Sequence, residues 1–340
     1  MRSSVRTLAA VAAAALLCVI PGVAQADPGP VAGECRSFSF PVPQGQLAST
    51  LCLPSAPTDT LMVLMSGSNY NGTYWDFHYQ PETYNFRRAM NAAGFATLIV
   101  DRLGNGASTH PPSVTLTATA TAQALHEIVQ TARRGIAGAQ PFGKVVTVGH
   151  SLTSGTSVIE ATTHHDVDGV LLTGYSHALN ISETIGVIST YYQAANDPVF
   201  AGQNLDPGYL TSRPGTRMQD FHGEGNVDPE VLAIDERTKE TFSLTEYPDG
   251  LTSTLPGMSS LITAPVLIVN GGRDRLSCGT NYSICRDSAT LQAAEAPFFG
   301  PSAKLQAFVL PGSGHSVNLA RNTVAYHRAV IDWMNSTVRQ

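Results

Sequence analysis

Three residues, Ser151, Asp274 and His315, have the types that nucleophilic hydrolysis requires. A serine hydroxyl is a poor nucleophile at neutral pH, so a histidine must take its proton and a carboxylate must hold the imidazole in the right tautomer. Ser151 follows an apolar run, Asp274 follows an apolar run and two glycines, and His315 lies in the segment PGSGHS. We expect Ser151 to be the nucleophile, His315 the base and Asp274 the orienting acid.

Each of these residues also has a structural interpretation. Ser151 would suit a helix N-cap, His315 a solvated loop and Asp274 a surface turn. Asp287 is the nearest rival carboxylate, but it lies where a helix should begin, and capping suits it better there. No other histidine lies between the last predicted strand and the last predicted helix.

The elements that must position these residues alternate along the chain. Apolar runs predict strands at 61–65, 96–100, 145–148, 170–172, 266–269 and 305–310, and helical patterns lie at 81–93, 118–134, 152–164, 288–296 and 317–338. This alternation is typical of an α/β protein with a mainly parallel sheet and crossover helices. Ser151 then falls at a strand-to-helix turn, with its hydroxyl above the sheet and helix N–H groups nearby for an oxyanion.

Four segments together resemble the α/β-hydrolase family. They are residues 145–152 around Ser151, 266–274 ending at Asp274, 309–316 around His315, and the strand-and-turn pattern at 96–108. The resemblance spans about 60–176 and 264–338. It implies an α/β-hydrolase fold and a serine hydrolase that cleaves a small-molecule carboxylic ester through an acyl-enzyme, without a cofactor. The same triad also serves C–C bond, lactone and amide hydrolases, and a non-catalytic binding protein that retains the fold is the alternative from another class.

The resemblance also implies two backbone donors to an oxyanion. One is the residue after the nucleophile, Leu152. The second follows a His-Gly pair in the family, and because Ser66 and Gly67 stand there in this chain, Ser68 N–H is the expected donor.

Two further features of these segments concern the shape of the site. The family pattern Gly-x-Ser-x-Gly has Thr153 at its fifth position, and a β-branched residue there must find room or push the helix outward. Tyr70, Tyr74 and Trp75 follow on the loop of Ser68. They either line an acyl pocket or pack beneath an inserted segment.

That inserted segment is predicted between the strands at 170–172 and 266–269. Residues 177–263 hold 12 acidic and 4 basic residues, a charge of −8. A loop of that length without secondary structure would be unusual. We therefore expect a helical cap at 177–263 on a core made of 27–176 and 264–340.

Residues 1–26 have the order of a secretory signal peptide. Two arginines precede an apolar run at 8–20, and Ala24-Gln25-Ala26 supplies a small-x-small cleavage pattern. We expect a mature chain that begins at Asp27 and is exported, to the periplasm or the extracellular medium.

Four cysteines remain in the expected mature chain, and four can pair in three ways. Cys35 and Cys52 are equidistant from the bond between Pro43 and Gln44, within a Pro-Gln-Gly-Gln turn signal, which predicts a hairpin in which they face each other. Cys278 and Cys285 close a short loop, so local pairing of both is favoured, and an exported protein favours oxidation.

Composition and spacing argue against three other kinds of protein or site. The net charge of −6 supplies no basic surface for nucleic acid, and the longest apolar run is shorter than the roughly 20 residues of a membrane span. No Cys-x-x-Cys or His-Glu-x-x-His spacing is present, and residues 164–166 (HHD) are interpreted as a helix end. We therefore predict no nucleic-acid partner, no integral membrane association and no metal site.

Overall fold

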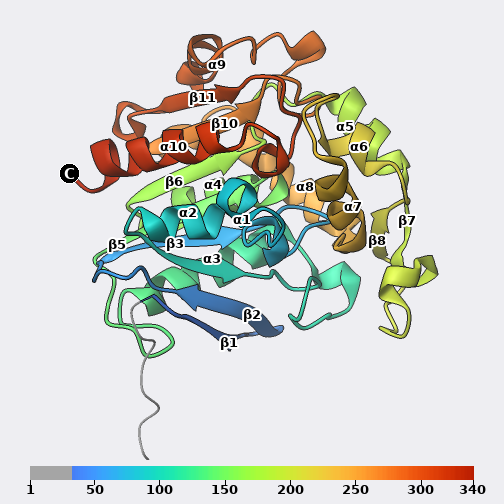
Figure 1. Cartoon of the computed structure of the whole chain (residues 1–340), viewed down its shortest axis with the longest axis horizontal. Coiled ribbons are helices and arrows are strands. Elements are labelled where there is room, and N and C mark those ends of the chain that lie inside the picture. Colours follow the sequence, from blue (N-terminus) through green and yellow to red (C-terminus); the bar gives the residue numbers. More distant parts are fainter. Residues whose placement is uncertain (1–32) are drawn as a thin grey trace, which may run out of the picture.

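The computed structural model describes residues 33–340, whose main sheet has the order β1-β2-β4-β3-β5-β6-β10-β11 (Figure 1). Strands β1 and β2 run antiparallel to their neighbours, and the remaining pairs are parallel. The bounds are β1 (Cys35–Val42), β2 (Gly45–Cys52), β3 (Thr60–Met65), β4 (Ala96–Val100), β5 (Lys144–His150), β6 (Gly169–Thr173), β10 (Val266–Gly271) and β11 (Gln306–Leu310). The predicted signal peptide lies outside the described residues.

Both faces of the sheet are covered by helices, because alternate residues of its buried strands point to opposite sides. Leu61 and Val63 of β3 belong to one core and Met62 and Leu64 to the other. The first core includes residues of α3 (Ala118–Ala132), α4 (Leu152–His164) and α9 (Ser288–Glu295). The second includes residues of α1 (Pro81–Tyr84), α2 (Phe86–Ala92) and α10 (Val324–Trp333). The predicted α/β fold with its mainly parallel sheet is confirmed.

Two predicted helices are interrupted. The helix expected at 81–93 is divided at Asn85, whose backbone is extended and whose side chain caps α2 by accepting from Arg88 N–H at 2.8 Å. The helix expected at 317–338 begins as one 3₁₀ turn, Val317–Leu319, and α10 starts only at Val324. Ala320 is extended between them and forms a bridge with Val227.

The N-terminal hairpin has the predicted register. Cys35 pairs with Cys52 across β1 and β2, and a disulfide joins them. A second disulfide joins Cys278 to Cys285, shortly after β10. The local pairing expected from the spacing is therefore the pairing found.

The segment between β6 and β10 contains more than helices. Its α-helices are α5 (Ile181–Ser189), α6 (Arg217–Phe221), α7 (Pro229–Arg237) and α8 (Tyr247–Gly250). An antiparallel sheet of β7 (Tyr191–Gln193), β8 (Tyr209–Ser212) and β9 (Phe242–Ser243) lies among them. Strands of two to four residues are too short to produce a recognisable alternating pattern, so the sequence did not reveal them. Figure 1 shows α5, α6, β7 and β8 gathered on its right-hand side.

None of the helices within residues 33–340 has the length and apolar character that a membrane crossing demands.

Candidate active site

The predicted nucleophile lies on a sharp turn between β5 and α4. Ser151 has φ 56° and ψ −119°, a conformation that residues other than glycine adopt at a cost in energy. Gly149 permits the turn, because a Cβ there would lie 2.5 Å from Cα of Ser154 in α4. Ser151 N–H donates to Thr173 O of β6 at 2.7 Å and ties the turn to the sheet. This is the backbone of a strand-to-helix elbow.

Thr153, the departure from the family pattern, finds room in this elbow. Its side chain is buried, and Oγ1 accepts from His150 N–H at 3.0 Å while lying 2.7 Å from Met65 O, to which it donates. The threonine hydroxyl therefore joins the ends of β3 and β5. The close approach of Gly149 to α4 means that the helix is not pushed outward.

Asp274 and His315 meet beyond the carboxyl ends of β10 and β11. His315 Nδ1 donates to Asp274 Oδ2 at 2.9 Å, and both side chains are buried. Asp274 Oδ1 accepts from the backbone N–H groups of Leu276 at 2.9 Å and Ser277 at 3.1 Å. Because the carboxylate can only accept, the proton of the neutral ring lies on Nδ1. His315 Nε2 is buried and has no hydrogen-bond partner among the described residues.

The loop of His315 is packed directly against the inserted segment. A Cβ on Gly314 would lie 2.4 Å from the backbone carbon of His222, so only glycine fits there. Ser316 N–H donates to Phe221 O at 2.9 Å. The residues on either side of His315 therefore depend on the end of α6 for their position.

The loop after β3 reaches Ser151. A Cβ on Gly67 would lie 2.9 Å from Cβ of Ser151, so Gly67 and the adjoining Ser68 lie beside the elbow. Leu152 is the first residue of α4, where backbone N–H groups have no acceptor within the helix. The two backbone groups predicted to bind an oxyanion thus belong to segments that adjoin Ser151.

Tyr70, Tyr74 and Trp75 do not line the cavity described below. Tyr70 packs against Arg217 of the inserted segment, with the guanidinium carbon 4.4 Å from the ring centroid. Tyr74 stacks on His150 with the ring centroids 4.3 Å apart, and Trp75 is fully buried. These large rings belong to the second core and pack beneath the inserted segment. Other residues therefore line the cavity.

His150 is a residue whose role the sequence did not reveal, since it occupies the variable position of the Gly-x-Ser pattern. It is fully buried, and its ring lies 5.2 Å from that of His315 and 5.3 Å from that of Tyr70. Burial lowers the pKa of His150 well below its usual value. The ring is therefore a neutral packing group between the aromatic cluster and the candidate base.

A buried ionic cluster on the inserted segment was also invisible in the sequence. Arg217 donates to both carboxylate oxygens of Asp235, at 2.7 and 2.8 Å, and His222 Nε2 lies 2.9 Å from Asp235 Oδ2. Although burial alone would raise it, the pKa of Asp235 is held well below its ordinary value by Arg217 and His222. Tyr70 links the cluster to the His315 loop, because its hydroxyl lies 2.7 Å from that of Ser316.

Ser151 and His315 line one cavity. The inserted segment supplies part of its wall, including Leu179, Thr184 and Leu251. No described residue that lines it carries a carboxylate, an ammonium or a guanidinium group. Concave, mostly apolar sites with a few polar groups are typical of small-molecule binding.

Asp287, the rival carboxylate, lies elsewhere in the fold. It is the N-cap of α9, where its side chain accepts from Thr290 N–H at 2.8 Å. The capping role expected from its position is the one found.

The comparisons with known proteins agree with the observed fold. Among solved structures, the α/β hydrolase GrgF from Penicillium sp. sh18 matches with a TM-score of 0.61 at 15% identity, over 90% of this chain and 100% of that chain. A thermophilic esterase from Thermogutta terrifontis matches with a TM-score of 0.57 at 17% identity, over 90% and 99% of the two chains. A thermostable carboxyl esterase from Bacillus coagulans matches with a TM-score of 0.58 at 12% identity, over 89% and 99%. At such identities the likeness shows the fold alone.

No curated protein matches the sequence. A model of the Alpha/beta hydrolase family, however, matches residues 62–329, well over half of the chain. On that match and the eight-stranded sheet, the chain belongs to the alpha/beta hydrolase family.

Proposed function

We propose that this chain is an exported serine hydrolase that cleaves carboxylic esters of small uncharged molecules through an acyl-enzyme. The observation that carries the proposal is the 2.9 Å hydrogen bond between His315 Nδ1 and Asp274 Oδ2, with Nε2 of the same ring unpartnered and the ring lining the cavity of Ser151. An imidazole held in this tautomer offers Nε2 as a general base.

In the proposed first step, His315 Nε2 takes the proton of Ser151 Oγ as the oxygen attacks the ester carbonyl carbon. The resulting oxyanion accepts hydrogen bonds from the backbone N–H groups of Leu152 and Ser68. The tetrahedral intermediate then expels the alcohol, which receives the proton from His315. Water attacks the acyl-enzyme by the same route in reverse, and the carboxylic acid leaves.

The substrate class follows from the walls of the cavity. Leu152, Tyr175, Tyr247 and Leu276 are among its lining residues, and no charged side chain faces a substrate from the described part of the chain. An anionic acyl group would lose its hydration there without gaining a cation. We further infer that residues 177–263 act as a cap, since they form part of this wall.

The proposal is tested with a fluorophosphonate probe and graded p-nitrophenyl esters. Ser151→Ala is expected to abolish labelling and to lower kcat about 10⁴-fold or more, because a hydroxyl nucleophile is removed. Ser176→Ala, a serine change in the wall of the same cavity, is the matched control and should keep the label. A folded wild-type protein that resists the probe and turns over no ester, amide or lactone would contradict the hydrolase assignment.

Substrate charge is tested separately. An uncharged butyrate ester should react at least tenfold faster than an ester of comparable size with a terminal carboxylate. Equal rates would contradict the inference that the uncharged cavity wall selects uncharged substrates. They would not affect the assignment of Ser151 as the nucleophile.

Export is the remaining part of the proposal, supported by the two disulfides. The intact mass of secreted protein should correspond to a chain that begins at Asp27 with four hydrogens fewer than the reduced form. An unprocessed N-terminus would contradict it.

A further inference from the structure

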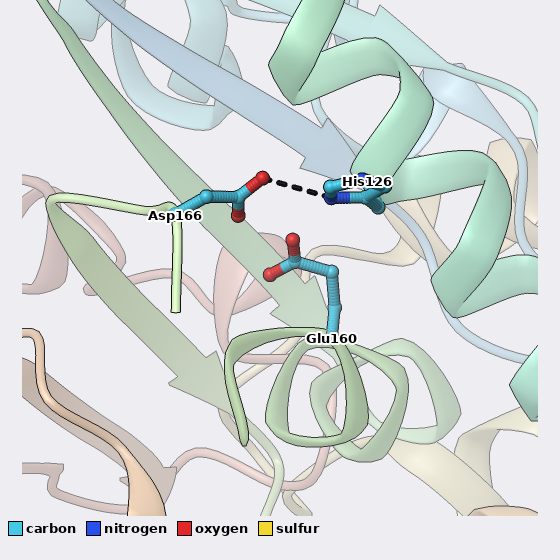
Figure 2. Close-up of side chains that lie close together, drawn as sticks. All are labelled: His126, Glu160 and Asp166. Carbon is cyan, nitrogen blue, oxygen red and sulfur yellow. Dashed lines mark ion pairs between the residues drawn. The ribbon is translucent and has the colours of Figure 1, made fainter. Parts of the chain in front are cut away.

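Three metal-binding types of side chain meet between α3 and α4, outside the candidate active site. His126 comes from α3, Glu160 from α4 and Asp166 from the loop that follows α4, and Figure 2 shows the three side chains pointing toward one another. One atom from each, an imidazole nitrogen and two carboxylate oxygens, lie within 4.8 Å of one another.

Glu160 is the residue that suggests a bound ligand at this cluster. The residue is 0% exposed, and neither carboxylate oxygen has a hydrogen-bond partner among the described residues. Figure 2 shows its carboxylate between the other two side chains. A buried carboxylate without donors is costly, so such a group is expected to hold a ligand or a proton.

The other two side chains are held in place around the same point. His126 Nδ1 lies 2.8 Å from Asp166 Oδ2, the ion pair drawn in Figure 2. Gln130, one turn further along α3, donates to Asp166 Oδ2 at 2.6 Å, which orients the carboxylate. Asp166 Oδ1 is buried without a partner. Arg133, the C-cap residue of α3, pairs with Asp168 and donates to the backbone carbonyl of Asp166.

We propose that His126, Glu160 and Asp166 bind one divalent transition-metal cation, for which Zn²⁺ is the best match. One imidazole nitrogen and two carboxylate oxygens form a mixed donor set that suits zinc, whereas Ca²⁺ and Mg²⁺ favour sites built of oxygen alone. Three protein ligands leave a tetrahedral ion one position for water. His126 and Gln130 also line a hollow of the protein surface, which gives the ion access from solvent.

The proposed ion has a structural role. Glu160 is nine residues beyond Ser151, so it lies roughly 13 Å along the axis of α4 from the nucleophile. At that distance the ion cannot contact a substrate at Ser151. It joins α3 to the end of α4 and its following loop, and its binding free energy adds to the stability of the fold.

A proton is the competing occupant. Burial and the neighbouring Asp166 raise the pKa of Glu160 to about 9, so a protonated Glu160 that donates to Asp166 would also satisfy these oxygens. Glu160→Gln separates the two cases, since the amide can donate as a protonated carboxyl does but is a poor zinc ligand.

The experiment uses the purified full-length mature protein, treated with a chelator and then titrated with ZnCl2. Bound zinc is measured per chain after gel filtration, and the Tm is followed in parallel. Wild type should bind one Zn²⁺ with a rise in Tm of several degrees. Glu160→Gln and His126→Gln should each lower the affinity at least tenfold and lose the rise in Tm.

Glu127→Gln is the matched control, because it makes the same chemical change on the neighbouring residue of α3, outside the cluster. It should bind zinc as wild type does. The proposal fails if wild type binds no zinc, or if Glu160→Gln and His126→Gln bind it as tightly as Glu127→Gln. Should Glu160→Gln not fold, His126→Gln alone decides, since His126 lies nearer the surface, with its side chain 24% exposed.

Discussion

Gly67 lies directly against Ser151, such that a Cβ on Gly67 would be 2.9 Å from Cβ of Ser151 and 2.6 Å from the carbonyl oxygen of His150. A methyl group cannot enter this space without moving the loop. Gly67→Ala should therefore displace the Ser68 N–H and lower kcat about 100-fold, the usual effect of losing one oxyanion donor. Steady-state kinetics on a p-nitrophenyl ester measure this fall in kcat.

Ser68→Ala is the companion variant, because it keeps the backbone N–H and removes only the side-chain hydroxyl. Its kcat should fall less than tenfold. Wild-type kcat in Gly67→Ala, or a larger loss in Ser68→Ala, would contradict the assignment of the second donor to the backbone.

The hydroxyl of Thr153 is predicted to stabilise the elbow. Thr153→Val keeps the shape of the side chain but leaves His150 N–H and Met65 O unpaired in a buried place, which should cost about 2 kcal/mol of unfolding free energy. Thr153→Ser retains the hydroxyl and should lose less. Urea denaturation of the two variants gives the comparison, and equal losses would mean that the methyl group, and not the hydroxyl, matters.

The Cys278–Cys285 disulfide closes a loop that begins directly after Leu276 and Ser277, whose backbone N–H groups donate to the Asp274 carboxylate. Replacing both cysteines by serine should lower kcat and cost about 2.5 kcal/mol on the chain-entropy model. The equivalent change at Cys35 and Cys52 is the matched control. It should cost about 3 kcal/mol yet leave kcat unchanged, because that hairpin is at the far edge of the sheet. The same kcat in both double variants would contradict the prediction.

His327 is predicted to weaken the fold in acid. Burial lowers its pKa from 6.5 to about 3. Between those values the unfolded chain binds a proton that the folded chain does not, so stability falls as the pH falls, by up to about 1.4 kcal/mol per pH unit. Above pH 6.5 the group has no such effect.

His327→Gln should remove this part of the pH dependence while a side-chain donor to Asn318 Oδ1, 3.0 Å from His327 Nε2, is retained. Unfolding free energies in urea at pH 7, 5.5 and 4 test it. If the curves for wild type and variant run parallel, His327 does not titrate differently in the two states.

The strands and the triad candidates were predictable because their signals are local. A strand such as β5 is buried on both faces and so is a continuous apolar run, and the Gly-x-Ser pattern marks the turn at its end. The backbone break at Asn85 was not predicted, because a helix N-cap in the middle of an amphipathic pattern is recognised only when the flanking helices are known. The register of the hairpin followed from the equal distance of Cys35 and Cys52 from the turn.

The contacts that support the site could not be predicted because they join distant parts of the chain. Arg217 and Asp235 are ordinary charged residues in the sequence, and only the fold buries them together beneath Tyr70. His126 and Glu160 lie 34 positions apart on different helices, and no metal-binding spacing marks them. Such pairs depend on how α3 packs on α4, which periodicity does not specify.

The contact between Gly314 and His222 limits how the family's parts can be recombined. Caps are attractive units to exchange between relatives when specificity is to be redesigned. Here the main chain at Phe221 and His222 packs directly against the His315 loop and helps to fix its position. A chimera that imports a foreign segment in place of residues 177–263 must therefore reproduce this short stretch of backbone, or it will acquire a new pocket above a misplaced His315.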